Sequence, residues 1–160
     1  MRTRAGFESS VAPHWTVMAH FAARLVGAVD GDDVVQDALA SAWRLRERFD
    51  PERGSLRTWL LTLVADQARK HHRSTARRLR LISTADAPPA SDAQIERTVD
   101  LERAVVRLSP RQKLAVDLYY YLDLPIAEVA TVMGCSEGTA KSTLADARTR
   151  LRAYLGDDDR

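Results

Sequence analysis

The sequence predicts an all-α fold, with two small helical domains joined by a flexible linker. Apolar residues recur at helical spacing along most of the chain, and the alternating pattern of β-strands is not found. Residues 81–97 differ, because they are rich in Ala, Ser and Asp and contain the adjacent prolines Pro88 and Pro89. The length of 160 residues suits one ordinary domain or two small ones.

The first half of the chain predicts three helices. The first runs from Pro13 to Val29 and ends before a turn at Asp30-Gly31, and the second runs from near Asp32 to Arg48. The second helix has an apolar stripe formed by Val35, Ala38, Leu39 and Ala42.

A loop separates the second helix from the third. Pro51 and Gly54 interrupt any helix there, and Ser55 is placed to cap the third helix. Trp59 lies in the apolar stripe of that helix, so we expect its ring to be buried in the core rather than exposed as a surface on which another ring could stack. The stripe consists of Leu56, Trp59, Leu60, Leu63 and Val64.

Charge is segregated although the formal net charge is only +2. From Asp30 to Asp37 there are four acids and no base, and from Arg69 to Arg80 there are six bases and no acid. Such segregation suggests at least two partners, one basic and one acidic. For any one charge run, the alternative is a solvated helix face.

The second half contains a helix-turn-helix pattern. Ser109-Pro110 starts one helix, on which Leu114, Leu118 and Leu122 space the buried face. Pro125 then opens a short helix that Gly134 ends, and Ser136 caps the next one. Two helices joined by a short Gly-containing turn are typical of DNA binding, with the second helix in the major groove. The inner face of that helix is Ala140, Leu144, Ala147 and Leu151.

Residues 118–151 resemble region 4 of the sigma-70 family, through Glu128-Val129-Ala130, Gly134 and the segment Ser136 to Ser142. Response-regulator domains carry a similar segment. The first half resembles sigma region 2, through Asp32 to Asp37, the pair Ala42-Trp43, and the stretch from Phe49 to Trp59-Leu60. Together, with a linker in place of region 3, they indicate the compact extracytoplasmic-function (ECF) group.

The resemblance implies an RNA polymerase sigma factor, not an enzyme, that recognises promoter minus-ten and minus-thirty-five elements and promotes DNA melting. Its expected partners are promoter DNA and the beta-prime and beta subunits of core polymerase, and it leaves room for an anti-sigma factor. The expected domains are region 2 over 1–80, the linker over 81–97, region 4 over 98–156 and an acidic tail over 157–160. A two-domain helix-turn-helix regulator that acts without polymerase is the alternative.

The resemblance assigns three groups of site residues. Core polymerase binding is expected at Asp32, Asp33, Gln36, Asp37 and Arg44, on a face that we expect to include Ser41. Minus-ten contacts are expected at Asp50, Glu52, Arg53, Ser55, Arg69, Lys70 and Arg73. Minus-thirty-five contacts are expected at Ser136, Glu137, Thr139, Lys141, Ser142 and Arg148. The sequence departs from the family pattern at Asp66, Pro125 and Thr143, which bears on promoter preference and affinity rather than on class.

The remaining signals argue against other classes. The single cysteine, Cys135, rules out a disulfide framework and is expected to be a packing residue. His71 and His72 are adjacent, point about 100° apart on a helix and make a poor metal pair, so we expect them to extend the basic DNA-facing surface. No cofactor or metal is expected, and without a signal peptide or membrane span the expected location is the cytoplasm.

Overall fold

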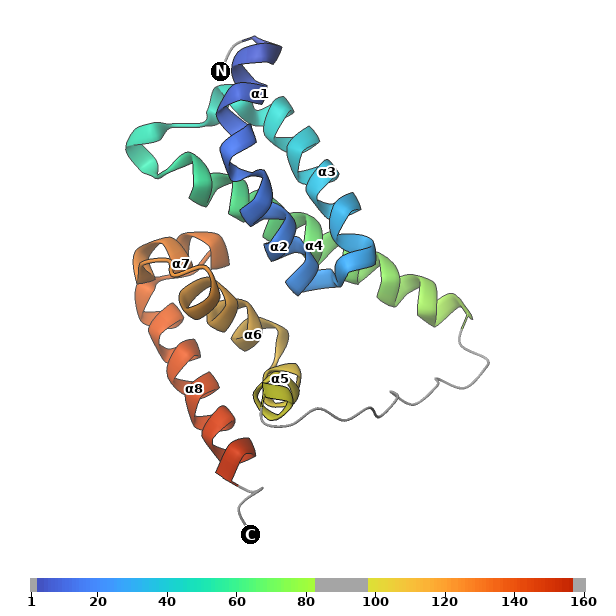
Figure 1. The fold of residues 1–160 in the computed structure, drawn as a ribbon, viewed down its shortest axis with the longest axis vertical. Helices are drawn as coiled ribbons and strands as arrows, with labels where there is room; N and C mark the ends of the chain where they lie inside the picture. Colours follow the sequence, from blue (N-terminus) through green and yellow to red (C-terminus); the bar gives the residue numbers. More distant parts are fainter. Residues whose placement is uncertain (1–2, 83–97, 157–160) are drawn as a thin grey trace. The chain divides into compact units, whose positions relative to one another are not determined.

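The computed structural model describes residues 3–82 and 98–156, which form only helices and their connections. The predicted all-α fold class is confirmed. The chain divides into two compact units, of which the first contains α1 to α4 and the second contains α5, α6, α8 and most of α7 (Figure 1). Most of the predicted linker (83–97) and the predicted acidic tail (157–160) lie outside the described residues.

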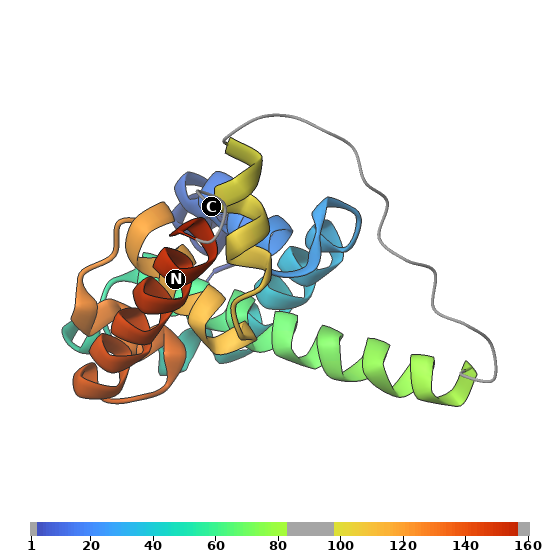
Figure 2. The ribbon, with the colours of Figure 1, turned by 90° about the horizontal axis from the view of Figure 1, so that it is seen from below.

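Four α-helices build the first unit. They are α1 (Arg4–Val11), α2 (Trp15–Val26), α3 (Ala28–Leu45) and α4 (Leu56–Ile82), with short 3-10 turns at Ala12–His14, Arg46–Arg48 and Pro51–Arg53. Helices α2 and α3 pack side by side, α4 crosses them, and its last turns continue beyond them (Figures 1 and 2). The core consists of fully buried side chains from all three helices, among them Met18, Phe21, Val35, Ala38, Leu60 and Val64.

The turn between α2 and α3 lies at Gly27, not at Asp30-Gly31 as predicted. Gly27 has φ +89°, which favours glycine, and its N–H donates to the Ala23 carbonyl at 2.8 Å. Gly31 lies inside α3 and is buried, and a Cβ there would come within 3.1 Å of the Ala23 nitrogen, because α2 packs closely against it. One glycine therefore forms the turn, and the other lies where α2 and α3 pack closely.

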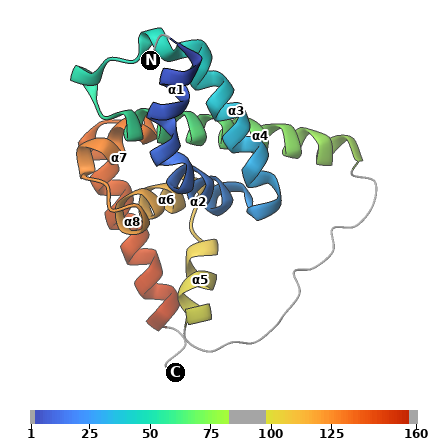
Figure 3. The same cartoon turned by 45° about the horizontal axis from the view of Figure 1, so that its top comes forward.

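Helix α1 was not predicted. It begins at a Thr3 cap that accepts from the Gly6 N–H at 3.2 Å. Helix α1 lies near the last turns of α3 (Figures 1 and 3). Phe7 is buried and meets Trp43 of α3 edge to face, with 5.3 Å between the ring centroids. One aromatic pair thus anchors a short helix that has few other apolar residues.

The second unit consists of α5 (Thr98–Val106), α6 (Pro110–Val116), α7 (Ile126–Met133) and α8 (Glu137–Gly156). Ser109 and Gln112 form a reciprocal capping box at the start of α6, as the predicted Ser109-Pro110 cap requires. A π-helical turn, Asp117–Tyr121, follows α6 and changes the helical period. Leu118 and Leu122 are buried as predicted, whereas Leu114 is half-buried.

The helix-turn-helix has the predicted geometry. Gly134 has φ +64° after the last turn of α7, and Cys135 donates its N–H to the Ala130 carbonyl at 3.0 Å. Ser136 caps α8 by accepting the Thr139 N–H at 3.1 Å. The inner face of α8 is buried at Ala140, Leu144 and Ala147 and half-buried at Leu151.

Candidate functional sites

The five residues predicted to bind core polymerase lie exposed on α3. They are Asp32, Asp33, Gln36, Asp37 and Arg44. The opposite side of the helix is buried at Val35, Ala38 and Ala42, so the packing of α3 points this polar face to solvent. Two carboxylates and an amide spaced by three and four residues, Asp33, Gln36 and Asp37, make it suitable for a basic partner.

Ser41 does not belong to this exposed face, contrary to the prediction. Ser41 is only 5% exposed, because Gln67 of α4, which is itself 8% exposed, covers it. The Ser41 hydroxyl oxygen accepts hydrogen bonds from Gln67 Nε2 at 2.9 Å and from Arg44 Nη2 at 3.0 Å. A buried hydroxyl thereby links an exposed guanidinium to the neighbouring helix.

The loop between α3 and α4 is held by its own backbone and by Asp50. The Asp50 carboxylate accepts the Glu52 N–H at 3.0 Å, and its carbonyl accepts the Arg53 N–H at 3.1 Å. Gly54 has φ +152°, a conformation that other residues rarely adopt. Ser55 then caps α4 by accepting the Thr58 N–H at 3.1 Å, as predicted.

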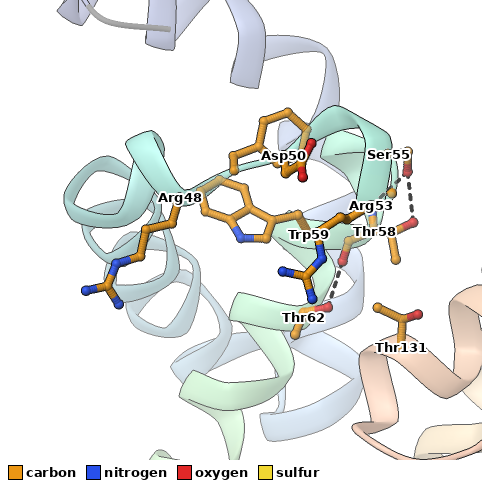
Figure 4. Close-up of a pocket in the computed structure, with 10 residues that line it drawn as sticks. Arg48, Asp50, Arg53, Ser55, Thr58, Trp59, Thr62 and Thr131 are labelled. Atoms are coloured by element: carbon orange, nitrogen blue, oxygen red, sulfur yellow. Dashed lines mark hydrogen bonds between the residues drawn. The ribbon is translucent and has the colours of Figure 1, made fainter.

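This loop and the first turns of α4 line a pocket (Figure 4). Trp59 is half-buried and lines it, so the expectation of a core tryptophan is wrong. The Trp59 ring packs against Phe49 with 5.3 Å between centroids, the Arg53 guanidinium lies near that ring, and Arg48 also lines the pocket (Figure 4). Within the first unit the lining also includes Asp50, Gly54, Ser55, Thr58 and Thr62. The pocket offers an aromatic surface, positive charge and hydroxyl groups at one place.

The predicted minus-ten residues of α4 lie beyond this pocket. Arg69, Lys70 and Arg73 are exposed further along α4. Asp66, the departure from the family pattern, forms an ion pair with Arg69. The helix therefore partly neutralises its own negative charge next to the basic run.

His71 and His72 face the α2–α3 turn rather than extending the basic surface, which corrects the prediction. His71 Nε2 lies 3.3 Å from the Asp30 carboxylate, and His72 Nε2 lies 2.9 Å from the Leu25 carbonyl. The side of α4 that holds both rings is turned toward the end of α2 and the start of α3. These histidines attach α4 to the turn at Gly27.

The predicted minus-thirty-five residues are all exposed on α8 and the turn before it. They are Ser136, Glu137, Thr139, Lys141, Ser142 and Arg148. Ser142 donates its hydroxyl to the Thr139 carbonyl at 3.0 Å, which leaves its oxygen able to accept from outside. Lys141 and Glu137 lie 4.0 Å apart with both side chains more than half exposed, so this pair is weak and leaves Lys141 available to another partner. Thr143, a departure from the family pattern, is half-buried and donates to the same carbonyl at 2.8 Å.

Sequence reasoning missed Trp59 as a lining residue and the link from Ser41 to Gln67. The described side chains hold no group of three or more His, Cys, Asp or Glu residues arranged to bind a metal ion. Over the described part of the chain, no helix combines the length and apolarity needed to cross a membrane.

Two family models match the chain. The model of sigma-70 region 2 matches residues 12–78, and the model of sigma-70 region 4 matches residues 98–151. Both matched ranges include the site residues predicted above for the corresponding region.

Curated relatives and solved structures agree with these matches. The ECF RNA polymerase sigma factor SigM of Mycobacterium tuberculosis is 35% identical over 144 residues, which cover 86% of this chain and 71% of the relative. SigL of the same species, also an ECF sigma factor, is 30% identical over 151 residues, which cover 89% of this chain and 84% of SigL.

Among solved structures, the sigma factor RpoE of Bartonella quintana, in complex with the anti-sigma factor NepR, matches with a TM-score of 0.76 and 25% identity, over 94% of this chain and 97% of that one. CnrH, in complex with the cytosolic domain of CnrY, matches with a TM-score of 0.71 and 26% identity, over 98% of this chain and 92% of that one. The chain belongs to the sigma-70 family, in the ECF group, and is an RNA polymerase sigma factor of transcription initiation.

Proposed function

We propose that this sigma factor divides its work among three surfaces: the exposed face of α3 binds core polymerase, the loop pocket with α4 recognises the minus-ten element, and α8 recognises the minus-thirty-five element. In this proposal region 2 spans 1–80 and region 4 spans 98–156, with a linker at 81–97 and an acidic tail at 157–160. The site of action is the cytoplasm, where polymerase and promoter DNA meet.

The pocket beside Trp59 is the observation that carries the minus-ten assignment. Extruding a base from duplex DNA costs about a few kcal/mol of unpairing and unstacking, which the protein must offset. A half-buried indole offers a stacking surface, and the Arg48 and Arg53 side chains offer charge for the adjacent phosphates. A base held there cannot re-pair, so the pocket would favour the melted promoter.

The exposed basic side chains of α4 extend the proposed DNA-binding surface along the phosphate backbone of the DNA. Arg73 follows Arg69 by four residues and Lys70 by three, and no acid occurs after Asp66 until the helix ends. Contacts to phosphates add affinity that does not depend on sequence. We assign them the role of holding the single-stranded region.

The start of α8 supports the minus-thirty-five assignment. The first residues of a recognition helix meet base edges in the major groove, and Lys141 and Ser142 are exposed there. Arg148 lies about two turns further along and suits a phosphate contact. An anti-sigma factor is a further proposed partner, because RpoE and CnrH were solved with the anti-sigma factor NepR and with CnrY, respectively.

Run-off transcription by core polymerase, with and without this chain, on a promoter library randomised at both elements tests the proposal. We expect transcripts only with the chain, from promoters that share sequence at both elements. If the chain binds the library DNA but gives no transcripts with core polymerase, it acts instead as a helix-turn-helix regulator.

The α3 assignment has its own test. Changing Asp33→Lys together with Gln36→Ala should weaken core binding at least tenfold, because like charges brought together at an interface cost several kcal/mol. Circular dichroism should show unchanged helicity, since both side chains are exposed. Glu102→Lys, an exposed acid on α5, is the matched control. Unchanged affinity in the folded double variant would remove α3 from the interface.

A further inference from the structure

A buried hydrogen-bond network lies directly under the exposed face of α3. Ser41 Oγ accepts from Arg44 Nη2 at 3.0 Å on one side and from Gln67 Nε2 of α4 at 2.9 Å on the other. A serine hydroxyl has two acceptor positions, so these two donors fill both. Ser41 and Gln67 are buried, whereas Arg44 is exposed. The network thus begins inside the unit and ends at the surface.

Arg44 differs in charge from the residues that share its face. Asp33 and Asp37 are carboxylates that suit a basic partner, but a guanidinium must be directed toward an acceptor. A free arginine side chain samples many rotamers, and ordering it on binding lowers affinity. A tether through one of its nitrogens restricts those rotamers before the partner arrives and leaves its other N–H groups available.

We propose that Ser41 and Gln67 are positioning residues, which hold the Arg44 guanidinium ready for core polymerase. The inference rests on the proposed function of the α3 face. Gln67 belongs to α4, the helix that carries the proposed minus-ten residues, so α4 fixes the direction of a side chain in the polymerase-binding face. A change at Gln67, which is 8% exposed, therefore alters polymerase affinity through Arg44.

A double-mutant cycle on the affinity of the full chain for core polymerase tests this. Ser41→Ala should weaken binding roughly three- to tenfold, as expected for the loss of one hydrogen bond to a charged group. Arg44→Ala should weaken it by at least as much. In the combined variant we expect the affinity of Arg44→Ala alone, because Ser41 acts only through Arg44. Additive losses would overturn the proposal.

Gln67→Met serves as a second variant, since methionine has a similar length but donates no hydrogen bond to Ser41. It should weaken binding about twofold or more in the parent chain and not at all with Arg44→Ala. Ser10→Ala is the control, because Ser10 donates only to the Gly6 carbonyl on α1. Urea unfolding of every variant separates lost stability from lost binding.

The two proposals fail differently. If Arg44→Ala leaves core affinity unchanged, Arg44 is not part of the polymerase-binding face, and the positioning role falls with it. If Arg44→Ala weakens binding but Ser41→Ala and Gln67→Met do not, the α3 face stands and the positioning role alone is wrong.

Discussion

Helices α4 and α8 begin with the same hydrogen-bonded cap but lie in different surroundings. The Ser55 and Thr58 hydroxyls are 2.8 Å apart, and the Ser136 and Thr139 hydroxyls are 2.9 Å apart. In both caps the threonine N–H donates to the serine at 3.1 Å. Thr58 is 3% exposed beside the pocket, whereas Thr139 is exposed on the surface.

The comparison shows that surroundings, not the local motif, separate the two proposed ways of contacting DNA. In the proposed function, an unpaired base enters the pocket that the loop before α4 forms with Trp59. In the proposed function, the exposed residues at the start of α8 instead meet base edges of a duplex in the major groove. The same four-residue start therefore lies beside a pocket in one unit and on an exposed surface in the other.

The largest effect is expected at Trp59. Trp59→Ala removes the aromatic surface of the pocket, and stacking on one base contributes about 1–3 kcal/mol, so transcription should fall about ten- to a hundredfold. Trp59→Phe should retain much of the activity. Trp15→Ala, at a tryptophan that is 47% exposed in the same unit, is the matched control. Full transcription by a folded Trp59→Ala chain would show that the pocket takes no base.

A more selective effect, which depends on the promoter sequence, is expected at the start of α8. Lys141→Ala and Ser142→Ala should each change the preferred bases at the minus-thirty-five element, at a cost of about 1–3 kcal/mol if a good base contact is lost. Transcription from the library randomised at both elements measures this. Glu52→Ala or Arg53→Ala should shift only the minus-ten preference. Exchanged outcomes would reverse the assignment of units to elements.

The two caps themselves should differ in stability. Ser55→Ala and Ser136→Ala each remove a helix cap worth about 1 kcal/mol. The loss should be larger at Ser55, because the Thr58 N–H that it caps belongs to a buried residue and is less accessible to water than that of the exposed Thr139. Thermal unfolding measures both changes. Equal losses would mean that burial at the pocket adds nothing to the cap.

The smallest effect is expected at Arg148. A phosphate contact adds affinity for any sequence, so Arg148→Ala should weaken DNA binding evenly and lower the salt slope by about one. Binding titrations at several salt concentrations, on matched and random duplexes, give the slope. A loss confined to one promoter sequence would instead make Arg148 a base contact.

Local signals predicted the second unit well. The capping box at Ser109, the turn at Gly134 and the cap at Ser136 depend on residues within a few positions of one another, so the sequence displays them directly. The π-helical turn after α6 was not predicted. It departs from the 3.6-residue period, and apolar spacing predicts only regular α-helices.

The errors in the first unit come from contacts between distant residues. By sequence, either Gly27 or Gly31 could form the turn after α2. The structure places the turn at Gly27, because Gly31 packs against Ala23 inside α3. Ser41 follows the exposed face by position, yet Gln67 of α4 covers it. Trp59 follows the apolar stripe, yet the loop before α4 leaves its ring open to a pocket. Helical periodicity cannot show any of these three contacts.

Helix α4 is continuous over its 27 residues, and this has a mechanical consequence. A helix rises about 1.5 Å and turns about 100° per residue, so α4 spans about 40 Å as one rod. The angle between the pocket at its start and the arginines further along is therefore fixed by residue count. One inserted residue would rotate Arg69 and everything after it by about 100°, whereas seven would nearly restore their direction. In the proposed function, the continuous helix therefore fixes the angle between the bound base and the phosphates that Arg69 and the later arginines contact.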